Sequence, residues 1–191
     1  MTDFDEAVRL LLNGDLIVYP TDTLYALGAI MANEKAVKKI YEVKGRPYDF
    51  PLPVAVADIS AIDEIAIMNK QAQRLANFFL PGPLTLVLKK RETVPPFVSH
   101  DTVAVRVPKN LIAYKLLRKT GPLTATSANR HNGFPPATVE TAKKQLGSQV
   151  LYYLNGGSLL GIPSTIVDVT TDLIILREGS IPAQEVYAHR N

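Results

Sequence analysis

The chain has 191 residues, which is long enough for one domain with a full hydrophobic core and somewhat short for two. Apolar residues make up 47% and charged residues 20%, which is typical of a globular protein, and the net charge of +3 suits an anionic ligand but is low for a dedicated nucleic-acid binder. The absence of cysteine excludes disulfides and a thiolate nucleophile, and three widely spaced histidines disfavour a histidine-built metal site.

The N-terminal residues are acidic where a signal peptide would be basic, and no apolar run approaches the length that spans a membrane. We therefore expect a soluble, cytoplasmic protein without membrane contact.

Short apolar runs alternate with amphipathic ones along the chain, a pattern typical of α/β proteins. The first predicted strand covers residues 16–19 and stops at Pro20. The first predicted helix is capped by Asn33 and ends near Lys44, because Gly45 and Pro47 disfavour its continuation. Further strands are predicted at residues 52–56, 84–88, 103–107, 123–126, 151–154, 165–169 and 173–176. Further helices are predicted to begin at Asp58, Asn69, Asn110 and Thr138.

No low-complexity linker and no internal repeat divides these elements. The sequence predicts a single α/β domain over residues 1–191, with a twisted sheet, mixed or parallel, flanked by helices and with no additional C-terminal domain.

Two pairs of polar side chains follow predicted elements. Lys44 and Arg46 would point to the same side of an extended segment and suit a polyphosphate, although a lysine there could instead only offset the helix dipole. Ser127 and Asn129 could bind phosphate or sugar oxygens, or make local turns. No segment fits the phosphate loop G-x-x-x-x-G-K-[ST], so a nucleotide would be bound by another architecture.

Two arginines stand beside apolar strand residues. Arg106 interrupts the run 103–107 and Arg177 follows the run 173–176. A buried guanidinium needs an anionic partner, which is either a protein carboxylate such as Glu178 or a ligand. The segment 20–23 is dense in hydroxyls and could hold a small polar substrate. Nothing indicates a Ser-His-Asp triad or paired carboxylates, and no catalytic residue is assigned.

Several short sequence motifs match those of one protein family, and they occur along the chain in the same order as in that family. They are residues 19–25, 44–47 with 51–52, 81–85, 105–108, 126–129, 164–168 and 176–179. With these motifs the chain resembles the YrdC-like family, whose synthases make threonylcarbamoyl-adenylate. The resemblance implies a twisted sheet with an open concave basic face. It also implies that L-threonine, bicarbonate and ATP give threonylcarbamoyl-AMP and pyrophosphate, and that a downstream tRNA-modifying threonylcarbamoyl transferase uses this product at adenosine 37 of tRNA.

The resemblance also implies a set of site residues. The expected ATP-binding residues are Lys44, Arg46, Ser127, Asn129 and Arg177. The expected threonine-binding residues are Thr23, Arg106 and Ser164. Mg²⁺ is expected to arrive with ATP, without metal ligands from the protein.

The chain departs from the family pattern at three positions. Ala55, Phe50 and Ala26 stand where many members have His, Asn and Gly, respectively. These departures keep a paralogue with a changed substrate as an alternative. Another is a non-catalytic module that binds nucleotides, tRNA or double-stranded RNA on the basic face. A third is a carbamoyl-adenylate-forming enzyme like the related domain of hydrogenase-maturation proteins.

Overall fold

The computed structural model describes residues 3–190, whose strands form two mixed sheets. The smaller sheet has the order β8-β2-β1-β9. Its strands are β1 (Ile17–Pro20), β2 (Tyr25–Gly28), β8 (Thr126–Ser127) and β9 (Tyr152–Tyr153). The larger sheet has the order β11-β10-β5-β6-β3-β7, and β4 pairs with β5. Its strands are β3 (Val54–Ala55), β4 (Ala66–Ile67), β5 (Leu84–Lys90), β6 (Thr102–Arg106), β7 (Leu123–Thr124), β10 (Thr165–Asp168) and β11 (Ile174–Arg177). The predicted α/β class is confirmed.

Both sheets combine parallel and antiparallel pairs. In the larger sheet β5 pairs parallel with β10 and antiparallel with β6, while β3 pairs parallel with β6. This register sets Arg106 opposite Ala55 and Thr85 opposite Ile166. Arg106 and Thr85 therefore each lie beside an apolar residue from a distant part of the chain.

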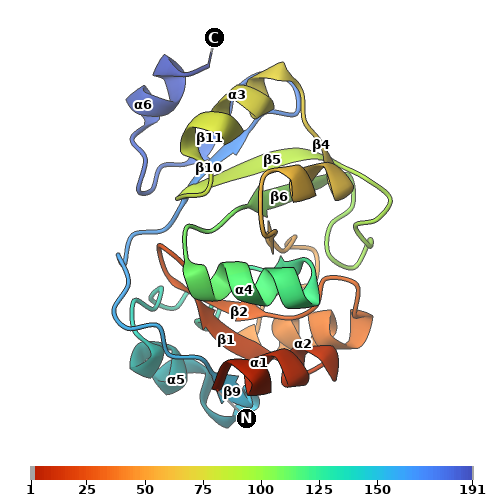
Figure 1. Cartoon of the computed structure of the whole chain (residues 1–191), viewed down its shortest axis with the longest axis vertical. Helices are drawn as coiled ribbons and strands as arrows, with labels where there is room; N and C mark the ends of the chain where they lie inside the picture. Colours follow the sequence, from red (N-terminus) through yellow and green to blue (C-terminus); the bar gives the residue numbers. More distant parts are fainter. Residues whose placement is uncertain (1–2, 191) are drawn as a thin grey trace.

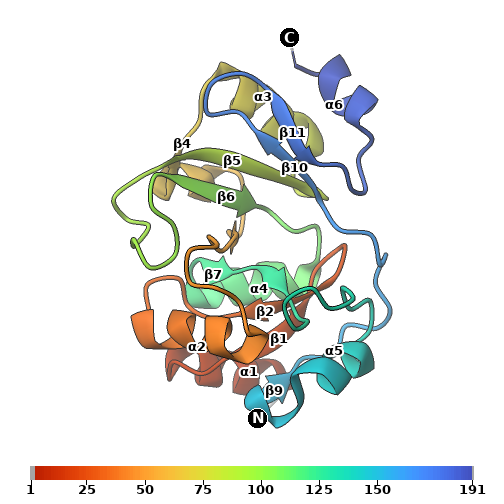
Figure 2. The same ribbon diagram turned by 180° about the vertical axis from the view of Figure 1, so that it is seen from behind.

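Helices cover the sheets from outside. They are α1 (Asp3–Leu12), α2 (Glu34–Lys44), α3 (Lys70–Phe79), α4 (Leu111–Thr120), α5 (Val139–Leu146) and α6 (Ala183–Ala188), with 3₁₀ turns at Ser60–Glu64 and Gly147–Gln149. Figure 1 shows α1 and α4 beside β1 and β2 in the lower part of the molecule, and α3 and α6 beside the larger sheet at the top. The view from behind shows α2 and α5 around the smaller sheet (Figure 2).

The predicted helix starts rest on side-chain caps. The side chains of Asn33, Asn69, Asn110 and Thr138 each accept a hydrogen bond from a main-chain N–H of the first helical turn. Gly45 ends α2 in the left-handed conformation, with φ at 60°. The helix expected after Asp58 is only the short 3₁₀ turn that begins at Ser60.

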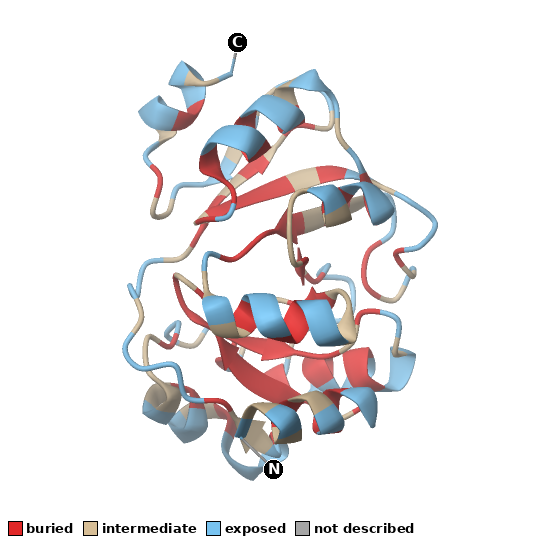
Figure 3. Ribbon diagram, in the orientation of Figure 1, coloured by how far each residue is buried: buried red, intermediate tan, exposed pale blue. Residues whose placement is uncertain are grey.

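Two hydrophobic clusters form the core. The larger one joins α2, α3 and the central strands, and the smaller one joins α1, α4 and β1. Every residue of β1 and β2 is buried, as the red strands of Figure 3 show. These two strands therefore hold the turn between them, residues 21–24, on a rigid support.

Five observed elements were not predicted: α1, β2, β4, α6 and the 3₁₀ turn at Gly147–Gln149. The signal for α1 is present in the sequence, because its buried residues Ala7, Leu10 and Leu11 are spaced three and four apart.

Among the described residues, no helix is both long and apolar enough to cross a membrane. The extent of the domain, residues 1–191, stays a prediction.

Candidate functional site

A pocket of about 360 Å³ is lined by strands of both sheets. The smaller sheet and the turn before β2 contribute Thr21, Thr23, Leu24, Tyr25, Ala26, Thr126 and Ser127. The larger sheet contributes Thr85, Val87, Ala104, Arg106, Ile166, Leu176 and Arg177. Loops add Arg46, Pro51, Pro53, Ala125, Pro135, Pro163 and Ser164. The pocket thus collects most of the side chains that the sequence singled out.

The charge of this pocket has one sign. Arg46, Arg106 and Arg177 line it, and the described lining residues include no Asp or Glu. Burial lowers the pKa of all three guanidinium groups, and the pKa of Arg177 is lowered further by Arg106. A pocket lined by guanidinium groups favours an anionic ligand.

Arg106 has a protein carboxylate as its partner. Its Nη2 donates to Asp22 Oδ1 at 2.6 Å and its Nη1 donates to Thr23 Oγ1 at 2.7 Å. Both members of the ion pair are largely buried, with side chains 10% and 14% exposed. The Nε of Arg106 is buried and has no hydrogen-bond partner in the described structure. Arg106 therefore keeps N–H groups without a partner in the described structure, and the Nε among them is enclosed by the protein.

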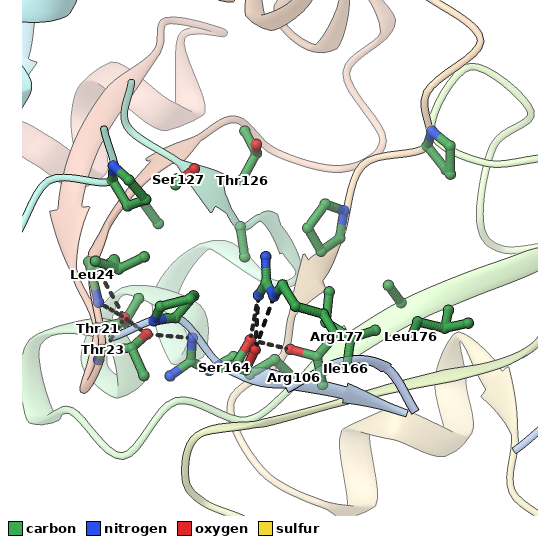
Figure 4. Close-up of a pocket in the computed structure, with 18 of the residues that line it drawn as sticks. Thr21, Thr23, Leu24, Arg106, Thr126, Ser127, Ser164, Ile166, Leu176 and Arg177 are labelled. Atoms are coloured by element: carbon green, nitrogen blue, oxygen red, sulfur yellow. Dashed lines mark hydrogen bonds between the residues drawn. The ribbon is translucent and has the colours of Figure 1, made fainter. Parts of the chain in front are cut away.

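The turn before β2 is stabilised by Thr21. Its hydroxyl donates to the main-chain oxygen of Leu24 at 2.7 Å and accepts from the N–H groups of Thr23 and Leu24, each at 3.2 Å. This is the local turn chemistry that hydroxyl side chains provide. It places Thr23 against Arg106, as Figure 4 shows.

Arg177 contacts Ser164 on the other side of the pocket. Its Nη2 donates to the main-chain oxygen of Ser164 at 2.8 Å, and its Nε donates to the same oxygen at 3.2 Å (Figure 4). The hydroxyl of Ser164 also meets that of Thr85 at 2.8 Å. Glu178, one of the partners that the sequence allowed for Arg177, does not pair with it, and its carboxylate accepts from the main-chain N–H of Ala183 at 3.2 Å.

Lys44 and Arg46 do not point to the same side. Lys44 is the last residue of α2, and Gly45 reverses the chain after it. The segment is therefore not extended, in contrast to the extended segment considered from the sequence. Arg46 lines the pocket, whereas Lys44 is buried outside its lining. The ammonium of Lys44 donates to the main-chain oxygens of Ser127 and Asn129, at 2.5 and 2.6 Å. Burial and, second, the charge of Arg46 lower its pKa to about 7.

Ser127 and Asn129 also differ in position. Ser127 lines the pocket, but Asn129 is buried behind it. The amide nitrogen of Asn129 donates to the main-chain oxygens of Arg130 and Gly133, at 2.6 and 2.9 Å. This side chain therefore forms the turn that the sequence offered as the alternative to ligand binding, and its role toward ATP stays a prediction.

The three departures from the family pattern have different surroundings. Ala26 lines the pocket. Ala55 is fully buried in the core, opposite Arg106 on the neighbouring strand. Phe50 lies outside the lining, and its ring is 5.3 Å from the guanidinium carbon of Arg46. Only Ala26 is thus placed to touch a ligand directly.

Two features of the site could not be assigned from the sequence. Asp22 was noted only as part of a hydroxyl-dense segment, and it is the partner of Arg106. Thr85 appeared only within a family motif, and it bonds Ser164 across two strands. Both pairs bring together residues about eighty positions apart, which local patterns do not reveal. Over residues 3–190, no cluster of three or more Asp, Glu or His side chains could hold a metal ion.

The comparison with protein families identifies the chain. The model of the Sua5/YciO/YrdC family, described as "Telomere recombination", matches residues 9–179. A "putative threonylcarbamoyl-AMP synthase" of Methanocaldococcus jannaschii is 39% identical over 92% of this chain and 85% of its own length. The chain belongs to the Sua5/YciO/YrdC family.

Two solved structures have the same fold. Sua5 of Pyrococcus abyssi, complexed with L-threonine, has a TM-score of 0.93 and 35% identity over 98% of this chain and 58% of its own. YciO of Escherichia coli has a TM-score of 0.88 and 30% identity over 96% of this chain and 92% of its own. The chain thus spans little more than half of the Pyrococcus protein.

Proposed function

We propose that this chain is a threonylcarbamoyl-AMP synthase, which converts L-threonine, bicarbonate and ATP to threonylcarbamoyl-AMP, pyrophosphate and water. The observation that carries the proposal is the convergence of Arg46, Arg106 and Arg177 on one pocket without an acidic lining residue in the described structure. The named relative in Methanocaldococcus and the likeness to a threonine-bound Sua5 support the same reaction.

The proposed reaction has two bond-forming steps. The amine nitrogen of threonine bonds to the carbon of bicarbonate and water leaves, which gives a carbamate. A carbamate oxygen then bonds to the α-phosphorus of ATP as the bond between that phosphorus and the β-phosphate oxygen breaks, and pyrophosphate leaves. Both steps bring anions together, so fixed guanidiniums reduce the repulsion. Holding the reactants in one pocket supplies much of the remaining rate enhancement.

We divide the pocket between the two substrates. Arg46, Ser127 and Arg177 would hold ATP, while Thr23, Arg106 and Ser164 would hold threonine. Lys44 and Asn129 would contribute to ATP binding indirectly, because their hydrogen bonds hold the segment that includes Ser127 in place. Mg²⁺ would be bound by the phosphate oxygens of ATP, since the described lining residues offer it no carboxylate.

The product would pass to a tRNA-modifying threonylcarbamoyl transferase in the cytoplasm, where tRNA and ATP are present.

The experiment is to measure pyrophosphate release from ATP and Mg²⁺, with and without L-threonine and bicarbonate, and with L-serine in place of L-threonine. We expect release that requires both co-substrates and prefers threonine. Arg106→Ala serves as the inactive variant, and Arg74→Ala, on the exposed face of α3, as its control.

Two results would overturn the proposal. Release that is indifferent to threonine would indicate a family member with another substrate. No release, together with RNA binding that weakens steeply with salt, would indicate a non-catalytic RNA-binding module.

A further inference from the structure

A second cavity, of about 250 Å³, lies between the chain after α2 and the loop that joins β5 and β6, which is at the left in Figure 2. One wall is made by Tyr41, Tyr48, Asp49 and Pro51. The other wall is made by residues 96–102. The volume is somewhat below that of pockets for drug-sized molecules, so the cavity suits a small ligand.

Hydrogen bonds hold the two walls together. The main-chain N–H of Leu52 donates to the main-chain oxygen of Val98 at 3.1 Å, which joins the two loops. The hydroxyl of Tyr41 donates to the main-chain oxygen of Phe50 at 3.1 Å, which holds the first loop against α2. The cavity is therefore a fixed part of the fold.

Aromatic rings form much of the lining. Tyr41 is buried, and the ring of the exposed Tyr48 lies 4.9 Å from its ring, tilted by 32°. Phe97 lines the cavity from the opposite loop. The face of an aromatic ring attracts a cation, and the attraction is strongest where water is excluded. The rings therefore favour an organic cation.

The charge of the cavity is also suited to a cation. Asp49 and Asp101 line it, and His100 is the one basic side chain in the described lining. Neither carboxylate has an ion-pair partner among residues 3–190. Burial raises the pKa of Tyr41, Arg46 lowers it in part, and the negative charge of Asp49 raises it again, so this charge reaches the ring.

A bare metal ion does not fit this arrangement. Asp49, His100 and Asp101 do not converge as metal ligands, because no group of three such side chains over residues 3–190 could hold a metal ion. A larger organic cation can reach carboxylates that are further apart. The first pocket has the opposite sign of charge, and of the described residues only Pro51 lines both cavities.

We propose that the second cavity is a separate ligand site that binds an alkylguanidinium ion. A guanidinium is planar and weakly hydrated, so it stacks on aromatic rings and donates two N–H groups to a carboxylate at once. Its alkyl chain would lie against Pro51, Pro96 and Val98. The proposal does not rest on the proposed function, since the two cavities have different linings.

The test is a titration of the ¹⁵N-labelled full chain followed by NMR. The probes are butylguanidinium and butylurea, which has the same shape without the charge. We expect saturable shifts of the amide signals of residues 48–50 and 97–102, with a dissociation constant of about 1 mM or below. Butylurea should bind at least about 5-fold more weakly.

A third probe, N-acetyl-arginine methylamide, carries the same head group on a peptide main chain. Tighter binding of this probe than of butylguanidinium at the same residues would support the site and assign the guanidinium to an arginine of a polypeptide. Weaker binding would support the site and assign it to a free small molecule.

Variants locate the cation within the cavity. Asp49→Asn and Asp101→Asn keep the shape of the side chain and should each weaken butylguanidinium binding by about 3- to 10-fold. Tyr48→Leu should weaken it by about 2- to 5-fold. The control is Asp172→Asn, an exposed carboxylate between β10 and β11, which should bind as wild type does. Thermal unfolding checks that each variant is folded.

Three results would overturn the proposal. They are shifts that do not saturate, equal binding of butylurea and butylguanidinium, and wild-type affinity in a folded protein that carries both Asp49→Asn and Asp101→Asn. The first two are measured on the wild-type chain, so they decide the matter even if a variant does not fold. Absence of pyrophosphate release, with saturable binding of butylguanidinium, would contradict the proposed function alone.

Discussion

The ammonium nitrogen of Lys44 lies 2.5 Å from the main-chain oxygen of Ser127, a residue 83 positions further along the chain. A second bond of 2.6 Å to Asn129 completes the contact, and the main-chain oxygen of Lys44 accepts from the N–H of His131 at 2.7 Å. The C-terminal end of α2 is thus tied to the segment that carries Ser127 into the pocket. Because Lys44 is buried, its protonation affects the free energy of unfolding as well as the position of Ser127 in the pocket.

Replacing Lys44 with methionine should change how stability depends on pH. The pKa of Lys44 falls from 10.5 to about 7 on folding, because the side chain is buried and close to Arg46. Between these two pH values the unfolded chain binds a proton that the folded chain lacks. The contribution of Lys44 to the free energy of unfolding therefore rises with pH from about 7 to 10.5, by up to about 1.4 kcal/mol per pH unit, and is lost as pH falls.

Urea unfolding between pH 7 and pH 10 measures this slope. We expect a shallower rise in Lys44→Met than in wild type. Lys35→Met, at an exposed position of the same helix, is the control and should keep the wild-type slope. Equal slopes in Lys44→Met and wild type would show that Lys44 keeps its proton in the folded protein.

Arg46→Ala should weaken ATP binding without unfolding the protein. The Arg46 side chain lines the pocket, and its own hydrogen bonds are two contacts with the main-chain oxygens of Phe50 and Pro51, at 3.5 and 3.1 Å. Loss of a charged hydrogen bond to phosphate should reduce ATP affinity by about 10-fold or more. Calorimetric titration with ATP measures the change, with Arg74→Ala as control. Wild-type ATP affinity in a folded Arg46→Ala protein would remove Arg46 from the ATP site.

The pair of Asp22 and Arg106 should behave as a coupled buried ion pair. Asp22→Ala leaves a buried guanidinium without its carboxylate, and we expect a loss of about 3 kcal/mol in the free energy of unfolding. Arg106→Ala should cost a similar amount, and the double variant should cost less than the sum of the two. Urea unfolding of the four proteins gives the coupling energy. Additive losses would mean that the contact contributes nothing to stability.

Tyr25→Phe should loosen residues 156–161, which lie in the connection between β9 and β10. The hydroxyl of Tyr25 donates to the main-chain oxygen of Gly157 at 2.8 Å and accepts from the N–H of Gly156 at 2.9 Å. Without it we expect faster hydrogen exchange at residues 156–161 and a loss of about 1 kcal/mol in stability. Mass spectrometry of exchange detects the change, with Tyr114→Phe on α4 as the control. Wild-type exchange across residues 156–161 would show that other bonds hold the segment.

The elements with strong local signals were predicted well. The helix from Asn33 to Lys44 has a capping side chain at one end and a glycine at the other, and both signals act within a single turn of chain. The strands at residues 84–88 and 165–169 were found close to their observed bounds because apolar runs of this length are typical of buried strands. In contrast, β2 was not predicted as a strand.

The site was predicted in part. Six of the eight expected residues line one pocket: Thr23, Arg46, Arg106, Ser127, Ser164 and Arg177. The other two, Lys44 and Asn129, belong to the same region but are directed into the protein. Spacing in the sequence gives no sign of this difference, because it depends on the reversal of the chain at Gly45 and on main-chain oxygens 83 and 85 positions away.

The sequence by itself determined the α/β class, the starts of the capped helices and six of the side chains that line the pocket. These depend on hydrophobic periodicity, capping and turn chemistry, which act over a few residues. Only the tertiary structure decided that the strands form two sheets, that Asp22 is the partner of Arg106, and that Lys44 faces the interior. Those outcomes depend on which strands pair and which charges are buried together, and such contacts join residues far apart in the chain.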